Sequence, residues 1–183
     1  REISDESHME IILIDGGSTD KTVDAARDFV DQVRVLDRPN RGAQLHAGAK
    51  LATGDLLFFL HADTQPPGNW QERLEKTWLK RHEKPLAATV FSIDYGNYLP
   101  YRLIAAGQNL RAKLLGLAYG DQGFCVSADN YAKSGGFPEI PLMEDVEFCR
   151  RLRKLGKVEV LPERIRPAAR RLRRWGALAN TIF

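Results

Sequence analysis

An imidazole and a carboxylate stand directly after an apolar run, and they are the first residues here that could do chemistry. The run Leu56–Leu60 leads into His61, Ala62, Asp63 and Thr64. Side chains two residues apart on an extended strand point the same way, so His61 and Asp63 could face one site. Cations that bind phosphates need rigid carboxylate oxygens, often only one or two from the protein. The local alternative stays open: His61 packs at the strand end and Asp63 caps a turn.

A second carboxylate, Asp15, follows the apolar run Ile11–Ile14 and precedes Gly16, Gly17 and Ser18. Glycines allow a backbone to approach a ligand closely, and the N-terminus of a following helix favours anions. An aspartate at this place could accept a hydrogen bond from a base or a ribose. Taken alone, however, the segment is typical of a turn followed by a helix cap.

Two adjacent acids, Glu144 and Asp145, begin a predicted helix. One of them could act as a general base toward a hydroxyl while the other holds the active-site loop. The helix dipole alone also favours acids at this position, and that explanation would suffice if no other motif were present.

The C-terminal part of the chain is strongly basic. From Arg150 to Arg174 there are eleven Lys or Arg and two acids. Arginine forks suit a diphosphate leaving group, and Trp175 could wall a site or stack on a sugar. The alternatives are a basic amphipathic helix that packs through Leu172 and Trp175, or contact with a polyanion or an acidic membrane surface.

The elements that must position these residues are indicated by apolar runs and turn residues. Strand, helix, strand, helix and strand fill the first 65 residues, with the first helix reaching about Val30, which predicts an α/β domain with a mostly parallel sheet. Further helices are predicted over about 70–81, 100–117 and 144–155, and strands near 87–95 and 157–161, the last ended by Pro162. Ligands of such sheets bind at the carboxyl ends of the strands, where Asp15 and Asp63 fall.

Composition narrows the class of protein. A chain of 183 residues with 43% hydrophobic and 28% charged residues fits one globular domain, and the net charge is only +3. The longest apolar run is far short of the ~20 residues that a membrane helix needs. Cys125 and Cys149 lack zinc-site spacing and are predicted to be reduced core residues of a cytoplasmic protein.

Four segments, taken in order, carry a resemblance to a known family. They are "EIILIDGGSTDKT", "RGAQLHAGAKLATGDLLFFLHADT", "YGDQGFCVSADNYAKSGGFPEIPLMEDVEFCRRLRKLGK" and "RRLRRWG". Over nearly the whole chain this pattern resembles family 2 glycosyltransferases of the GT-A fold. "HADT", "YGDQG" and "PLMEDVE" look like the bacterial subgroup labelled arsenosugar-biosynthesis-type glycosyltransferases. The resemblance implies one domain over 1–183, with a mostly parallel central sheet, helices on both faces, and the family's first strand absent.

The resemblance also implies a chemistry: transfer of a hexose from a nucleotide-diphosphate sugar to a hydroxyl acceptor, with inversion and a divalent metal, Mn²⁺ or Mg²⁺. It makes Asp145 the general base, supported by Glu144. The positions matched to donor and nucleotide binding are Asp15, Gly16, Arg41, His61, Asp63 and Arg174. The positions matched to the acceptor side are Gly120, Asp121, Gln122 and Trp175. Asp63 matches the metal ligand, and metal binding by His61 is left open.

The chain departs from the family pattern at three motif positions. Gly16 replaces the second acid of D-D-G-S, His61 replaces the first acid of D-x-D, and Arg171 replaces the Gln of Q-x-x-R-W. A catalytically inactive relative therefore stays an alternative, as does a basic module that binds nucleic acid or acidic lipid with steep salt dependence and no metal. The transferase interpretation expects no nucleic-acid partner, and it allows peripheral membrane contact through the basic C-terminal segment.

Overall fold

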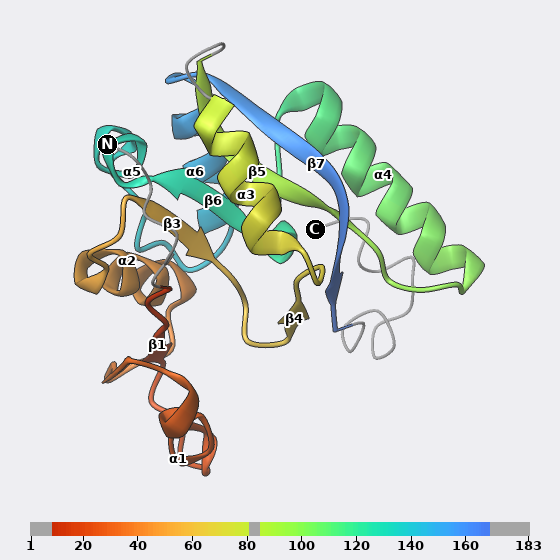
Figure 1. The fold of residues 1–183 in the computed structure, drawn as a ribbon. Helices are drawn as coiled ribbons and strands as arrows, with labels where there is room; N and C mark the ends of the chain where they lie inside the picture. The colour runs from red at the N-terminus through yellow and green to blue at the C-terminus, as the bar shows by residue number, and fades with distance from the viewer. Residues whose placement is uncertain (1–8, 81–84, 169–183) are drawn as a thin grey trace.

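The computed structural model describes residues 9–80 and 85–168, and these form helices packed around a curled sheet (Figure 1). The predicted site residues Arg174 and Trp175, together with Arg171, lie outside the described ranges. Within those ranges, no helix combines the length and the hydropathy that a bilayer crossing requires.

The main sheet has five strands in the order β3-β6-β5-β7-β4. Their bounds are Leu56–Phe59 for β3, Phe124–Ser127 for β6, Leu86–Ile93 for β5, Lys157–Pro167 for β7 and Thr64–Gln65 for β4. Strand β5 lies at the centre and is buried on both faces from Ala87 to Ile93. A continuous apolar run is the expected sequence for such a strand.

Helices cover both faces of this sheet, as predicted. In Figure 1, α3 (Trp70–Leu79) crosses in front of the sheet and α6 (Glu144–Leu152) lies behind it. Trp78 of α3 packs with Phe91 and Leu161 in one core cluster, and Phe148 of α6 packs with Val90 in the other. The predicted helices over 70–81 and 144–155 are therefore confirmed, each with a slightly earlier end. Cys125 and Cys149 are buried and free, and burial raises the pKa of Cys125 to about 12.

The direction of the strands corrects one expectation. Strand β5 is parallel to β7, but the β3–β6, β5–β6 and β4–β7 pairs are antiparallel, so the five-stranded sheet is mixed and not mostly parallel. An apolar run indicates burial and carries no information on strand direction. The long helix α4 (Leu99–Leu115) and the turn η3 (Gly120–Gln122) return the chain so that β6 runs against both of its neighbours.

Strand β7 corrects a second expectation, because it does not end at Pro162. Its pairing with β5 shifts register between Phe91↔Leu161 and Ser92↔Arg164, which leaves Pro162 and Glu163 in a bulge. A bulged residue needs no ladder hydrogen bond, so proline is tolerated there. Beyond the bulge the strand continues to Pro167 and pairs with β4.

The N-terminal elements form a separate parallel pair, β1 (Ile12–Asp15) and β2 (Gln32–Val35). Helix α1 (Thr22–Ala26) continues as the 3₁₀ turn η1 (Arg27–Phe29), so the helix predicted to reach Val30 is shorter. Helix α2 (Arg41–Leu51) is capped by Asn40, whose side chain accepts a hydrogen bond from the Ala43 N–H. Gln44 of α2 donates to the carbonyl of Ile14, which fixes α2 against β1.

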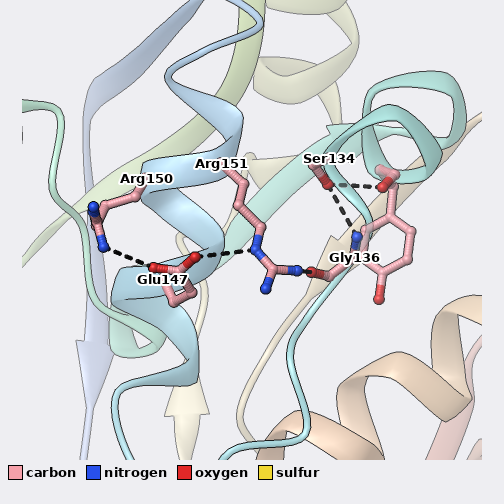
Figure 2. A network of polar contacts seen from close by, with 6 residues as sticks. Ser134, Gly136, Glu147, Arg150 and Arg151 are labelled. Carbon is pink, nitrogen blue, oxygen red and sulfur yellow. Dashed lines mark hydrogen bonds and ion pairs between the residues drawn. The ribbon is translucent and has the colours of Figure 1, made fainter.

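A polar network holds α6 against the loop that follows α5 (Ala128–Ser134). Glu147 accepts hydrogen bonds from Arg150 at 3.0 Å and from Arg151 at 3.2 Å, and Arg151 also donates to the Gly136 carbonyl (Figure 2). Exposed pairs of this kind contribute little each. Here the bond to Gly136 also links the last turn of α6 to the loop that follows α5.

Candidate active site

The residues after β3 form a bend, and their side chains reach a second loop. The His61 carbonyl accepts from the Thr64 N–H at 3.0 Å, and the Asp63 carbonyl accepts from the Ala168 N–H at 2.9 Å. His61 Nδ1 lies 3.1 Å from Asp121 Oδ1 in η3. The segment therefore makes the local turn, and it also brings an imidazole to the turn that precedes β6.

The start of α6 meets the same loop at Gly120. The Gly120 N–H donates to Asp145 Oδ2 at 2.8 Å, and Asp145 Oδ1 accepts from the Val146 N–H at 2.7 Å. A Cβ on Gly120 would stand 2.7 Å from both Cε1 and Nε2 of His61, so only glycine allows this approach. His61, Gly120 and Asp145 come from three separate segments and converge at one point.

Glu144 does not face this convergence point, because it pairs with α2. Its Oε1 lies 3.0 Å from Nε of Arg41, and the Glu144 side chain is almost completely buried. Arg41 and Glu144 therefore form an ion pair, although their contact does not have the alignment of a hydrogen bond at Glu144 Oε1. Glu144 therefore connects the first residue of α2 to the first residue of α6, which fits the predicted supporting role beside Asp145.

Gln122 is also turned inward. Its amide donates to the Phe91 carbonyl at 3.0 Å and accepts from the Tyr119 N–H at 3.2 Å. The side chain is completely buried, and both ends of the amide have backbone partners. Gln122 thus holds the η3 turn, which presents Gly120 and Asp121 beside His61.

The Asp15 side chain accepts hydrogen bonds within its own turn. Its Oδ1 accepts from the N–H groups of Gly17 and Ser18, and its Oδ2 accepts from the Ser18 hydroxyl at 2.6 Å. These bonds favour the ionised form, so the Ser18 hydroxyl first, then the backbone donors, lower the pKa of Asp15. Gly16 is closely packed, with its missing Cβ 3.0 Å from Cα of Pro39. The turn suggested by the sequence is therefore present, but Lys21, the residue before α1, makes no capping hydrogen bond through its side chain.

We expect a Ser18→Ala substitution to destabilise the fold by about 1 kcal/mol at neutral pH, because a hydrogen bond to a charged group is lost. The lowered pKa means that this contribution is present above the unfolded pKa and is lost as pH falls through the folded pKa. The difference from the parent should therefore shrink below about pH 4. Urea denaturation across pH checks it, and a difference that is constant with pH would contradict the assignment.

The described residues include no group of three or more His, Cys, Asp or Glu side chains that could hold a metal ion by themselves. A cation held mainly by a substrate diphosphate needs fewer protein ligands, commonly one or two carboxylates. Asp63 is exposed on the bend after β3 and fits that requirement. His61 fits it less well, because Nδ1 faces Asp121 and the buried Nε2 packs against Gly120.

Two residues that position the site were missed by the sequence interpretation. Met143, the residue before α6, has a φ of 65°, a conformation that is uncommon for a residue with a side chain. Gly42 lies under the Pro138 carbonyl, whose oxygen is 2.0 Å from where a Cβ would be. A methionine carries no signal for a positive φ, and the close approach at Gly42 joins segments almost a hundred residues apart.

The sequence matches the model of a known family, described as glycosyl transferase family 2, over residues 2–133. A stretch of 62 residues is 37% identical to the uncharacterized glycosyltransferase YibD of Escherichia coli strain K12, and it covers 31% of this chain and 18% of that protein. No comparison bears on the arsenosugar subgroup, which stays a prediction.

Solved structures resemble the fold. The mannosyltransferase PcManGT from Pyrobaculum calidifontis, in complex with GDP-Man and Mn²⁺, has a TM-score of 0.66 at 16% identity, covering 94% of this chain and 50% of that one. Glucosyl-3-phosphoglycerate synthase from Mycobacterium tuberculosis, in complex with Mn²⁺, UDP and glucosyl-3-phosphoglycerate, has a TM-score of 0.59 at 20% identity, covering 94% and 66%. The chain thus spans about half to two thirds of these proteins, and the likeness shows the GT-A fold.

Proposed function

Since this chain belongs to glycosyl transferase family 2, we propose that it transfers a sugar from a nucleotide-diphosphate donor to a hydroxyl acceptor. The observation that carries this proposal is the convergence of His61, Gly120 and Asp145. These residues come from three segments that resemble the family's motifs, and they meet there although they are far apart in the sequence. A basic module without catalysis would not need a buried carboxylate beside an imidazole.

Asp145 is proposed as the general base. Its two oxygens each accept one backbone N–H, and a carboxylate has about four lone-pair positions, so acceptor capacity remains for a substrate hydroxyl. The two backbone donors also orient the group before the substrate arrives. Attack by the acceptor oxygen from the face opposite the leaving diphosphate would invert the anomeric carbon, with one base and no covalent intermediate.

The donor side is proposed to include Asp63, Arg41, Asp15 and Gly16. Bound at Asp63, a divalent cation such as Mn²⁺ or Mg²⁺ would neutralise charge that develops on the diphosphate. Asp15 would contribute mainly through its turn, since its carboxylate already accepts three of about four possible hydrogen bonds there. The roles predicted for Arg174 and Trp175 belong to residues outside the described ranges. Membrane contact through the basic segment stays a prediction, because the end of that segment lies outside them as well.

The acceptor side is proposed at the η3 turn, where Asp121 lies beside His61. Gln122 would act there by holding the turn, because its amide is occupied by backbone groups. The two solved structures above contain GDP-Man in one case and UDP in the other, so the base of the donor needs its own test.

We expect the full chain to bind at least one nucleoside diphosphate from a panel of UDP, GDP, ADP and CDP, more tightly with Mn²⁺ than without it. Asp63→Ala should remove the gain from Mn²⁺, because it deletes the proposed metal ligand. Isothermal titration calorimetry measures both effects. Asp129→Ala is the matched control, since Asp129 is an exposed aspartate that pairs with Lys133 of its own helix.

Two results would count against the donor site. Failure of every nucleotide to bind, with and without Mn²⁺, contradicts donor binding by this chain. Retention of the Mn²⁺ effect in Asp63→Ala moves the metal to other residues and leaves the transferase proposal standing.

A further inference from the structure

The outward side of α4 is apolar and is left uncovered by the described residues. Four of its five exposed leucines follow helical spacing along one side: Leu99, Leu103, Leu110 and Leu114, here named the leucine stripe. Leu103 and Leu114 are 65% and 73% exposed. At 1.5 Å per residue the stripe is about 22 Å long. Figure 1 shows α4 at the side of the fold, and exposed apolar surface of this extent marks an interaction site.

The fold does not need the leucine stripe, because α4 is fixed by its other side. Ala105 and Ala112 are buried against the two core clusters. The Asn109 side chain accepts from the Ile93 N–H at 2.8 Å and donates to the Ile93 carbonyl at 3.0 Å. These contacts join α4 to β5, so among the described residues the stripe is not needed to hold α4 in place.

Cationic side chains flank the stripe without any acid to balance them. No Asp or Glu occurs between residues 95 and 120. Arg102 and Lys113 are exposed, and neither forms an ion pair within the described residues. They are eleven residues apart, about three turns, so they lie along the same edge of the stripe. Arg111 is turned inward, over the Tyr119 ring at 3.5 Å.

We propose that the leucine stripe, with Arg102 and Lys113, docks peripherally on the surface of a bilayer that contains anionic phospholipids. The leucines enter the boundary between headgroups and acyl chains, and the two cations reach the phosphate groups along one edge. An apolar stripe beside cations and without acids is the pattern that such a surface recognises. The helix lies along the bilayer and does not cross it.

Charge argues against a second copy of the chain as the occupant. Antiparallel packing of two stripes would bring Arg102 and Lys113 of both copies to one seam, with no acid on either α4 to pair them. The basic cluster on α6 is a weaker lipid site, because an acid of the same helix already pairs with its arginines. Its residues Arg150 and Arg151 already donate to Glu147 (Figure 2).

The test is co-sedimentation of the full chain with vesicles of phosphatidylcholine and phosphatidylserine in equal amounts, and with vesicles of phosphatidylcholine alone. The parent should pellet with the anionic vesicles only. Leu103→Gln with Leu110→Gln should weaken binding about 100-fold, because two leucines no longer bury apolar surface. Arg102→Gln with Lys113→Gln should weaken it about 30-fold at low salt.

The matched control is Phe29→Gln with Leu79→Gln, which removes two exposed apolar side chains outside α4 and should leave binding unchanged. Circular dichroism verifies that each variant is folded. If the variant with both leucines replaced does not fold, the variant with Arg102 and Lys113 replaced tests the proposal. Absence of pelleting by the parent, equal pelleting with neutral vesicles, or full binding by both α4 variants overturns the proposal. The proposal is also overturned if sedimentation equilibrium shows that the parent is a dimer and that Leu103→Gln with Leu110→Gln abolishes this dimer.

Discussion

Asp145→Asn should lower kcat roughly a thousandfold, the usual contribution of a general base, while nucleotide affinity stays within about threefold of the parent. The substitution keeps the shape of the side chain and removes its ability to take a proton. Turnover requires a donor and acceptor pair, which the nucleotide panel and an acceptor screen would identify. Steady-state kinetics and calorimetry on the same preparation then separate chemistry from donor binding.

Stability needs its own control in this experiment. An asparagine can accept only one of the two backbone N–H groups that Asp145 now satisfies, so about 1–3 kcal/mol of stability is also at risk. Ser127→Ala is matched for that loss, because it removes the side-chain cap of α5 and costs about 1 kcal/mol without changing the site. Parallel losses of activity and nucleotide affinity in Asp145→Asn would make Asp145 a structural residue and contradict its role as the base.

Gly42→Ala should lower the free energy of unfolding by about 3 kcal/mol, near the upper end of overpacking effects. The added Cβ would stand 2.0 Å from the Pro138 carbonyl oxygen and 3.3 Å from Cβ of Glu144. The obstacle is backbone, which cannot rotate away as a side chain could. Helix α2 must therefore shift, and the Arg41–Glu144 ion pair shifts with it. Urea denaturation measures the loss.

Gly107→Ala is the control for the same exchange in a helix. Gly107 lies in the middle of α4, and a Cβ there meets nothing within 4 Å. Alanine should therefore stabilise the protein by about 0.5–1 kcal/mol through backbone entropy and helix propensity. A loss at Gly42 no larger than 0.5 kcal/mol would show that the loop at Pro138 yields easily, against the expectation of a rigid contact.

Local features were predictable from the sequence, and the features that depend on distant contacts were not. The helix from Trp70 and the strand ending near Phe59 follow from apolar spacing and from the residues that bound them. The meeting of His61 with Gly120 requires two segments about sixty residues apart, and no periodicity encodes it. The acids Glu144 and Asp145 look equivalent in sequence. Only the positions of Arg41 and the Gly120 N–H assign them different partners.

Strand direction and strand length were missed for a physical reason. Burial on both faces produces the same apolar run in a parallel and in an antiparallel strand, so β6 could not be oriented from its residues. Pro162 was interpreted as a stop because proline normally interrupts a ladder. The bulge that accommodates it depends on the pairing with β5, which the residues of β7 alone do not reveal.

The bulge at Pro162 and Glu163 also determines which changes of chain length β7 can tolerate. It adds two residues opposite the step from Phe91 to Ser92, and an even number keeps Leu161 and Ile165 on the inner side of the strand. Loss of one residue there would turn the following side chains over, exposing Ile165 and burying Arg166. It would also move Ala168, the residue after β7, whose N–H donates to the Asp63 carbonyl. Related sequences should therefore differ in length at this point by pairs of residues, if they differ at all.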